Sequence, residues 1–414
     1  MFDAPTGGTF RVRQVPSLSA LRPMLQDAVS TPAGMAQRFA QYAASGHAEI
    51  QSPWVGLTTD GKVVPGLFPL QPSGASTQEI KDAADAWLIG LQDWQRAAGM
   101  FPIDDTAWRA WSNIHVFVMR HGVLLDACSE EQRARGLALV RATLSAGGYE
   151  TARNIMRLND ALGEVTGRFD EYGEWYYWLS VFGRPSLDEP WGWQIDGHHL
   201  IINCLVVGEQ VVMTPAFMGS EPTAVSDGRH AGTRVFGAEE QAGLDFVRSL
   251  AGAARAKAMP PLTDRVLRQQ RMDGRIQTAA FRDNARLEYA GLQAAELDSN
   301  GQRRLLELVE LYVGRMRPDH ARIKMDEVRR HLGDTHFLWV GGLEDDSTFY
   351  YRLHSPVILV EFDHLSGIAF DNEEPTRNHI HTVVRTPNGN DYGMDLLRQH
   401  YARHHQTPTL VSGG

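Results

Sequence analysis

Two stretches of the chain are rich in aromatic and β-branched residues, and they limit the possible folds more than any other feature. YWLSVFGRPSLDEPWGWQIDGHHLIINCLVV (residues 177–207) parallels FLWVGGLEDDSTFYYRLHSPVILVEFDHL (residues 337–365). Each contains an aromatic strand, an acidic turn with glycine, an aromatic pair, a short polar segment and an apolar run. This order is typical of β-strands joined by turns. We hypothesise a weak internal duplication that builds one antiparallel sheet or sandwich. Chance similarity between two strand pairs is the alternative.

Helical spacing of apolar residues dominates the rest of the chain. We expect residues 1–170 to be mainly helical and residues 171–414 to be β-rich, with inserted helices in 238–315, at 238–257 and 260–315. TAWRAWSNIHVFVMR (residues 106–120) is one of the expected helices, with Asp104 or Asp105 as its cap. The predicted class is therefore α+β, an antiparallel sheet surrounded by helices. A single continuous domain is the alternative to two parts.

Composition excludes several classes of protein. The 414 residues carry a formal charge of −10, which disfavours nucleic-acid and acidic-membrane partners. No apolar run reaches the roughly 18 residues of a membrane span, and no export signal is visible at the N-terminus, so we expect a cytoplasmic protein. The expected partner is a small-molecule substrate. A homodimer formed through exposed strand edges is a further expectation.

Sixteen histidines against two cysteines point to nitrogen and oxygen ligands. Alternate residues of a strand share a face, so in NHIHTVVR the side chains of His379 and His381 point the same way. In VILVEFDHL, Glu361 and Asp363 share one face and His364 lies on the other.

The dipeptide His198-His199 follows a glycine that makes a β-bulge possible. His199 shares its face with Asn203, and His198 shares its face with Asp196. Adjacent strand residues face opposite ways, so only one of the two histidines should enter a given site unless the strand is bulged.

Together these residues predict a metal site formed by His379, His381, Glu361 and one of His198 and His199. Two histidines and one carboxylate are typical of non-haem iron(II) oxygenases, whereas three histidines suit catalytic zinc or copper. Iron or copper is the first expectation and zinc the alternative. Each histidine taken singly could instead be a packed core residue.

Further candidates lie around this group. Arg385 follows on the His379 face and could pair with Asp391 or bind a substrate carboxylate. Asp391 could accept a hydrogen bond from a ligating histidine, or it could cap the last helix, as could Asp395. We assign Trp111, Asn113 and Asn203 to the substrate pocket, although an aromatic face is more often core.

Familiar catalytic motifs are absent from the sequence. It contains no phosphate-binding G-x-x-x-x-G-K-[ST], no H-E-x-x-H, no G-x-S-x-G and no strand-anchored G-x-G-x-x-G. Nucleotide phosphoryl transfer, thermolysin-type proteolysis, serine hydrolysis and Rossmann dehydrogenation therefore lose support.

The segments WGWQIDGHHLIIN, VILVEFDH and NHIHTVVRTPNGNDYGMDLLRQHY resemble the family known as domain of unknown function 3500. The helical stretches FPIDDTAWRAWSN and IMRLNDALGE are similar to its N-terminal half, so the likeness covers most of the chain. The resemblance implies a site at Gly197, His198, His199, Glu361, His379 and His381. It implies no established activity.

Three functions remain open at this point. The first is a metal-dependent oxidoreductase or oxygenase acting on a small organic substrate, with Glu361 as fourth ligand or general base and Arg385 holding an anionic group. The second is a zinc-dependent hydrolase or lyase on the same ligands. The third is a non-catalytic ligand-binding protein, which is favoured if Glu361, His379 and His381 do not approach one point.

Overall fold

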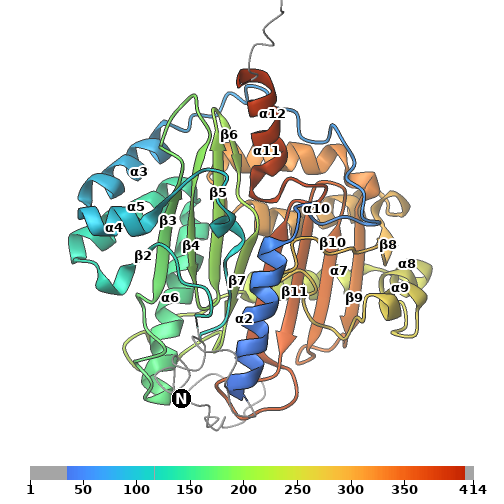
Figure 1. Cartoon of the computed structure of the whole chain (residues 1–414). Helices are drawn as coiled ribbons and strands as arrows, with labels where there is room; N and C mark the ends of the chain where they lie inside the picture. The colour runs from blue at the N-terminus through green and yellow to red at the C-terminus, as the bar shows by residue number, and fades with distance from the viewer. Residues whose placement is uncertain (1–34, 116, 406–414) are drawn as a thin grey trace, which may run out of the picture.

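A single open sheet organises the molecule. In the computed structural model, which describes residues 35–115 and 117–405, the described residues form one mostly antiparallel sheet of 12 strands in the order β1-β3-β4-β5-β7-β12-β11-β10-β9-β8, with β2 also paired to β3 and β6 to β5 (Figure 1). The strands are β1 (Met100–Phe101), β2 (Val123–Leu124), β3 (Tyr177–Phe182), β4 (Trp191–Gly197), β5 (Leu200–Val207), β6 (Gln210–Val212), β7 (Ala216–Ser220), β8 (Leu292–Gln293), β9 (His336–Gly341), β10 (Phe349–His354), β11 (Leu359–Leu365) and β12 (Thr376–Arg385). The predicted α+β class is confirmed, and the antiparallel sheet is one layer of strands, not a sandwich.

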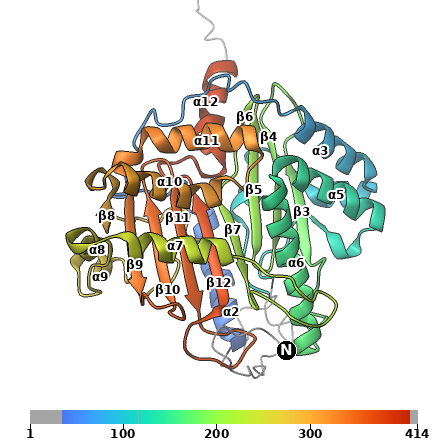
Figure 2. The ribbon, with the colours of Figure 1, turned by 180° about the vertical axis from the view of Figure 1, so that it is seen from behind.

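Helices cover the two faces of the sheet unequally. The helices α5, α6, α7, α10 and α11 lie over one face (Figure 2), whereas α2 and irregular segments lie over the other (Figure 1). The helices are α2 (Met35–Gln51), α3 (Gln78–Gly90), α4 (Asp93–Gly99), α5 (Glu130–Thr143), α6 (Ala146–Thr166), α7 (Gly237–Ser249), α8 (Gly252–Ala258), α9 (Arg265–Gln269), α10 (Ser299–Val313), α11 (Pro318–Arg330) and α12 (Met394–His404), with 3-10 turns η1 (Thr106–Arg109), η2 (Leu125–Ala127), η3 (Ala294–Glu296), η4 (Leu332–Asp334) and η5 (Asp391–Gly393). We call the first face the helical face and the second the α2 face.

The same order of elements occurs twice along the chain. A short strand, a 3-10 turn and two helices precede the strands in both halves: β2, η2, α5 and α6 lead to β3, β4, β5 and β7, and β8, η3, α10 and α11 lead to β9, β10, β11 and β12. In the sheet the two sets run in mirrored order and meet at β7 and β12. This repeated order supports the hypothesis of an internal duplication.

The connections between the paired helices also meet each other. Leu144, between α5 and α6, forms an antiparallel bridge with Met316, between α10 and α11. The Ser145 N–H donates to the Arg315 carbonyl and the Arg317 N–H donates to the Thr143 carbonyl, both at 2.9 Å. The reciprocal bonds join the helical layers of the two halves as β7 and β12 join their strands.

Residues 106–120 are not the helix that the sequence predicted. Only η1 forms, capped by the Asp105 side chain, which accepts from the Ala107 N–H. Beyond it the backbone bonds to other segments, since the Asn113 carbonyl accepts from the His199 N–H at 3.2 Å. Trp108 stacks on Phe182 with ring centroids 3.8 Å apart, so tertiary packing overrides the helical spacing.

The expected helix over 260–315 is also wrong in its first half. Only the five residues of α9 are helical before β8 begins at Leu292. The backbone N–H groups of Ile276, Gln277 and Thr278 donate instead to carboxylates of β11. Because these backbone N–H groups are hydrogen-bonded to side chains of the sheet, the segment satisfies them without forming a helix.

All described strands, including β1 and β2 from the first 170 residues, belong to one sheet, so a boundary near residue 170 does not interrupt it. Residues 1–34 of the expected helical part lie outside the described residues. Among the helices that the structure describes, none is long and apolar enough to cross a membrane.

The adjacent glycines of α6 test the junction of the two halves. A Cβ at Gly148 would lie 2.2 Å from the Arg315 carbonyl oxygen, whereas a Cβ at Gly147 would meet nothing within 4 Å. We expect Gly148→Ala to lower the free energy of unfolding by about 1–3 kcal/mol, because backbone must move. Gly147→Ala should be neutral or stabilising by up to about 1 kcal/mol. Urea denaturation measures both, and equal effects would contradict the close approach.

Candidate metal centre

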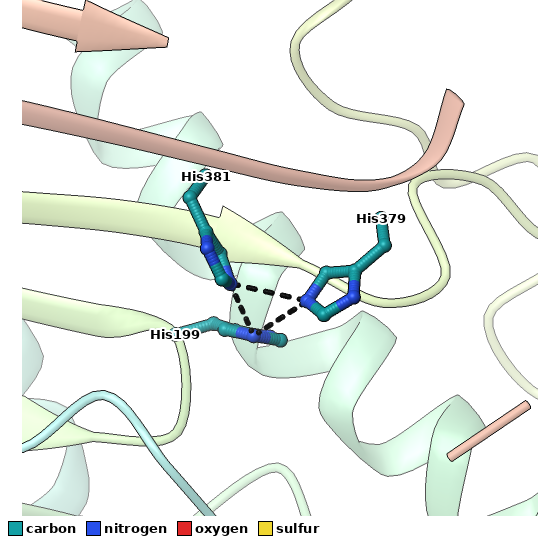
Figure 3. Close-up of side chains that lie close together, drawn as sticks. All are labelled: His199, His379 and His381. Carbon is teal, nitrogen blue, oxygen red and sulfur yellow. Dashed lines mark hydrogen bonds between the residues drawn. The ribbon is translucent and has the colours of Figure 1, made fainter. Parts of the chain in front are cut away.

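Three imidazoles meet at the end of the sheet where β12 begins. The Nε2 atom of His381 lies 3.1 Å from that of His379 and 3.1 Å from that of His199, and the Nε2 atoms of His379 and His199 are 3.3 Å apart (Figure 3). All three side chains are buried, and His381 retains the largest exposure at 9%. We call this group the histidine triad.

Strand geometry brings two of these side chains together. His379 and His381 alternate along β12 and share the α2 face, as the sequence predicted. His199 comes from the other half of the sheet. It occupies the second position of the two-residue turn that joins β4 to β5, with φ of +61°.

The two adjacent histidines of this turn make different contacts. His198 stacks on His199 with ring centroids 3.9 Å apart, and its Nδ1 lies 2.7 Å from Oδ1 of Asn159 on α6. His198 is therefore packed behind the triad. The expectation that only one of the two histidines enters the site agrees with this placement, although the backbone forms a turn here in place of a bulge.

Gly219 of β7 gives the imidazoles their room. It pairs in register with His381, and a Cβ there would lie 2.7 Å from Cδ2 of His381 and 3.3 Å from Cδ2 of His199. Any larger residue would push the rings apart. Nothing in the sequence pattern alone marks this glycine.

Groups behind the triad set its protonation. Nδ1 of His379 lies 2.8 Å from the Ser366 carbonyl, to which it can only donate, so in the neutral ring Nε2 is the nitrogen with the lone pair. Nδ1 of His381 faces Oδ1 of Asp363 at 3.6 Å, and Nδ1 of His379 faces a Glu221 carboxylate oxygen at 3.7 Å. A carboxylate behind each ligating histidine is a common arrangement at metal sites.

Burial changes the titration of these groups. It lowers the pKa of His199 and of His381 well below the usual histidine value, and the neighbouring histidines lower it further, so both rings are neutral at pH 7. Burial also raises the pKa of the Asp363 carboxyl to about 8. Among the described residues Oδ1 of Asp363 has no hydrogen-bond partner.

The triad has the donors and the spacing that a metal ion requires. Neutral imidazole nitrogen is the form that binds metals, and each Zn–N bond is about 2.1 Å long. Nitrogens 3.1–3.3 Å apart then subtend about 95–105° at a common ion, near tetrahedral or octahedral values. Three nitrogen atoms this close, with few hydrogens to share, are otherwise poorly satisfied.

Glu361 does not join the triad. Its carboxylate accepts from the N–H groups of Gln277 and Thr278, both at 2.9 Å, from the Thr278 hydroxyl at 2.5 Å and from the Tyr350 hydroxyl at 2.6 Å. The register explains this, because Asp363 pairs with His381 whereas Glu361 pairs with Val383, two residues farther along β12. Asp363 is thus the carboxylate of the E-x-D pair that the sheet places beside the histidines.

Arg385 and Asp391 pair with each other away from the triad. Nε of Arg385 donates to Asp391 at 2.7 Å, and its Nη2 donates to Asp283 at 2.8 Å. Asp391 also accepts from the Thr386 N–H at 2.7 Å, and both side chains are fully buried. Of the two expected roles for Arg385, the structure shows the pairing with Asp391.

The residues assigned to the substrate pocket lie in the layer beneath the triad. Nε1 of Trp111 donates to the Tyr392 hydroxyl at 2.8 Å, and its ring packs 6.3 Å from Phe217. Phe217 in turn lies 5.1 Å from His381. Asn203 bonds to Gln194 and to the Pro215 carbonyl, and the backbone carbonyl of Asn113 accepts from the His199 N–H.

A second group of possible ligands lies at the surface. Nε2 of His400 and of His405 each lie 3.4 Å from one carboxylate oxygen of Glu189. The Glu189 side chain is 60% exposed, so ordinary ion pairing accounts for this contact.

Comparison with known proteins gives a family without a known activity. The family model described as "Protein of unknown function (DUF3500)" matches residues 73–394, so the chain belongs to this family. Neither a curated protein nor a solved structure matches it. The matched range contains all three histidines of the triad.

The buried pair of Arg385 and Asp391 should serve stability and not metal binding. We expect Asp391→Ala to cost about 3–5 kcal/mol of unfolding free energy, because it removes a partner of a buried guanidinium. Asp395→Ala removes a carboxylate in the first turn of α12 that pairs with the exposed Arg398 and accepts from Gln399 at 2.8 Å, and it should cost about 1–2 kcal/mol. Urea denaturation compares the two variants. A mild effect of Asp391→Ala would contradict this role.

Proposed function

We propose that the protein is a metal-dependent enzyme whose metal is held by His199, His379 and His381. The observation that carries this proposal is the convergence of their three Nε2 atoms within 3.3 Å of one another in a buried setting. Three protein ligands leave positions open on an ion that prefers four or more. Open positions distinguish catalytic sites from closed structural ones.

The donor set favours zinc or copper over iron. A 2-His-1-carboxylate iron site needs a carboxylate among the ligands, and Glu361 is bonded to Tyr350, Thr278 and Gln277 instead. Three neutral imidazoles leave the full charge on the ion, which suits zinc and copper. Zinc supports a hydrolase or lyase, and copper supports an oxidoreductase acting on a small organic substrate.

Several groups of the protein around the triad have a defined role in this proposal. A bound metal would supply a Lewis acid for a water or substrate oxygen. The Ser366 carbonyl fixes the tautomer of His379, and Asp363 faces the rear nitrogen of His381. A carboxyl with a pKa of about 8 can hold or release a proton near neutral pH. Phe217 forms an apolar wall beside His381, the most exposed of the three.

A non-catalytic binding role is the competing proposal. Glu361 does not meet His379 and His381 at one point, and by the criterion set from the sequence this favours the binding role. His199 takes the third position instead. A buried triad with carboxylates behind two of its rings nevertheless supports metal chemistry more than ligand packing. Activity of the metal-loaded protein separates the two roles.

Adjacent histidines provide a matched test of the metal site. We expect protein purified without chelator to hold about one zinc or copper ion per chain. His199→Ala should lose it, with affinity falling more than about 100-fold, because a ligand is removed. His198→Ala should retain the ion, since His198 is bonded to Asn159 and stands outside the triad. Elemental analysis and titration with zinc measure both variants.

The identity of the bound ion decides between the hydrolase or lyase and the oxidoreductase, and the histidine variants test the metal site itself. Zinc without oxygen consumption supports the hydrolase or lyase, and copper with oxygen consumption supports the oxidoreductase. Equal metal content in the wild-type protein, His199→Ala and His379→Ala would overturn the metal site itself.

Two carboxylates of β11 offer a second matched pair. We expect Asp363→Asn to weaken zinc affinity by about 10–100-fold, because an amide cannot ionise to the carboxylate that would face Nδ1 of a metal-bound His381. Glu361→Gln, two residues away on the same strand and outside the triad, should leave zinc affinity unchanged after correction for any loss of folded protein. Calorimetric titration gives both values. Similar losses in the two variants would show that Asp363 has no special relation to His381.

A further inference from the structure

A pocket lies on the helical face of the sheet, away from the triad. Alternate residues of β7 point to opposite faces: Phe217 packs near His381, whereas Ala216 and Met218 line the pocket. Its other walls come from α10, α11, β6 and the end of β12. The sheet therefore separates this pocket from the histidines.

The pocket has an apolar floor and a polar rim. Its volume is about 100 Å³. The floor is formed by Met213, Ala216, Met218, Ile358 and Val384. The rim includes Gln71, Glu209, Lys324 and Glu327. An apolar cavity bordered by a few polar groups is the usual form of a small-molecule site.

The buried charge of the pocket lining, Arg315, is paired, whereas Glu209 and Arg330 stand at the exposed rim. Arg315 pairs with Glu239 at 2.6 Å, and Lys324 pairs with Glu327 at 2.5 Å. The hydroxyls of Thr214 and Thr386 bond to each other at 2.7 Å. A charged ligand seated on the floor would find no free counter-charge there, so an uncharged ligand fits the buried part of the pocket best.

Two buried nitrogen atoms of the lining residues have no hydrogen-bond partner among the described residues: Nε of Arg315, which can only donate, and Nε2 of His320. His320 is 97% buried, since only 3% of it is exposed, and its Nε2 has no hydrogen-bond partner among the described residues. Burial lowers the pKa of His320, which keeps the ring neutral. A neutral imidazole nitrogen can donate to or accept from one polar group of a ligand.

The two halves of the molecule differ at this point. In the first half α6 packs directly on β5 and β7, whereas its counterpart α11 packs chiefly on α10 and η4. The pocket occupies the space between α11 and β7. The direct packing of α6 on the sheet is not repeated by α11, so the pocket depends on where α11 lies.

We propose that this pocket binds a compact, uncharged molecule of about the size of one aromatic ring, with a single hydrogen-bonding group directed to His320. An engineered apolar cavity of about 150 Å³ holds benzene, and the present pocket is somewhat smaller but reaches a polar rim. The site is independent of the metal centre, and its occupancy does not rest on the function proposed for the triad.

Phenol and benzene are the probes that test this site. Titration followed by ligand-observed NMR should show that phenol binds and that benzene binds several-fold more weakly, because benzene leaves Nε2 of His320 unpaired. Ala216→Leu, which fills the floor, should weaken both probes at least tenfold. His320→Leu should remove the preference for phenol. His199→Ala should leave phenol binding unchanged, so a failure of the metal centre does not affect this result.

Crystals exposed to xenon provide a check that needs no variant. Xenon should occupy the floor between Met213, Met218 and Val384. Thermal unfolding of Ala216→Leu shows whether the variant is folded. The proposal is overturned if folded Ala216→Leu binds phenol as the wild-type protein does, if neither probe binds the wild-type protein, or if the pocket holds no xenon.

Discussion

The pairing of β7 with β12 is the contact on which the rest of the structure depends. It joins the last strand of the first half to the last strand of the second, with Gly219 opposite His381 and Ser220 opposite Ile380. Since β7 also pairs with β5, it holds the β4–β5 turn beside β12. A slip of one residue would turn His379 and His381 to the helical face and place a side chain where Gly219 now leaves room for the rings. The triad is therefore fixed by strand register.

The buried carboxylates of β11 show why position decides function. Asp363 and Glu361 share a face, and both accept bonds from the irregular segment at 276–278. The Glu361 carboxylate accepts its hydrogen bonds from that segment and from Tyr350, so it anchors the segment to the sheet. Asp363 uses one oxygen in this way and keeps the other directed at His381. One strand thus supplies a structural acid and a candidate functional acid.

Alternation along strands was enough to predict part of the site. It placed His379 and His381 on one face of β12, and it separated His364 from Glu361; His364 indeed bonds Glu240 on the helical face. It could not choose between Glu361 and Asp363, because that choice depends on the pairing register with β12. The helix expected over residues 106–120 failed because its tryptophans pack into the core and its backbone binds the β4–β5 turn. Local patterns do not contain such tertiary bonds.

The duplicated order of elements accounts for both proposed sites. The triad takes one histidine from the first half and two from the second, so neither half alone could hold the ion. On the opposite face the two halves have diverged, since α6 packs directly on the sheet whereas α11 packs chiefly on α10 and η4 beside the pocket. Identical halves would generate every feature twice, once on each side of the junction between β7 and β12. The triad uses different residues from each half, and the pocket lies beside α11 and not beside α6, so the sequence differences between the halves, not the repeated fold, create each site.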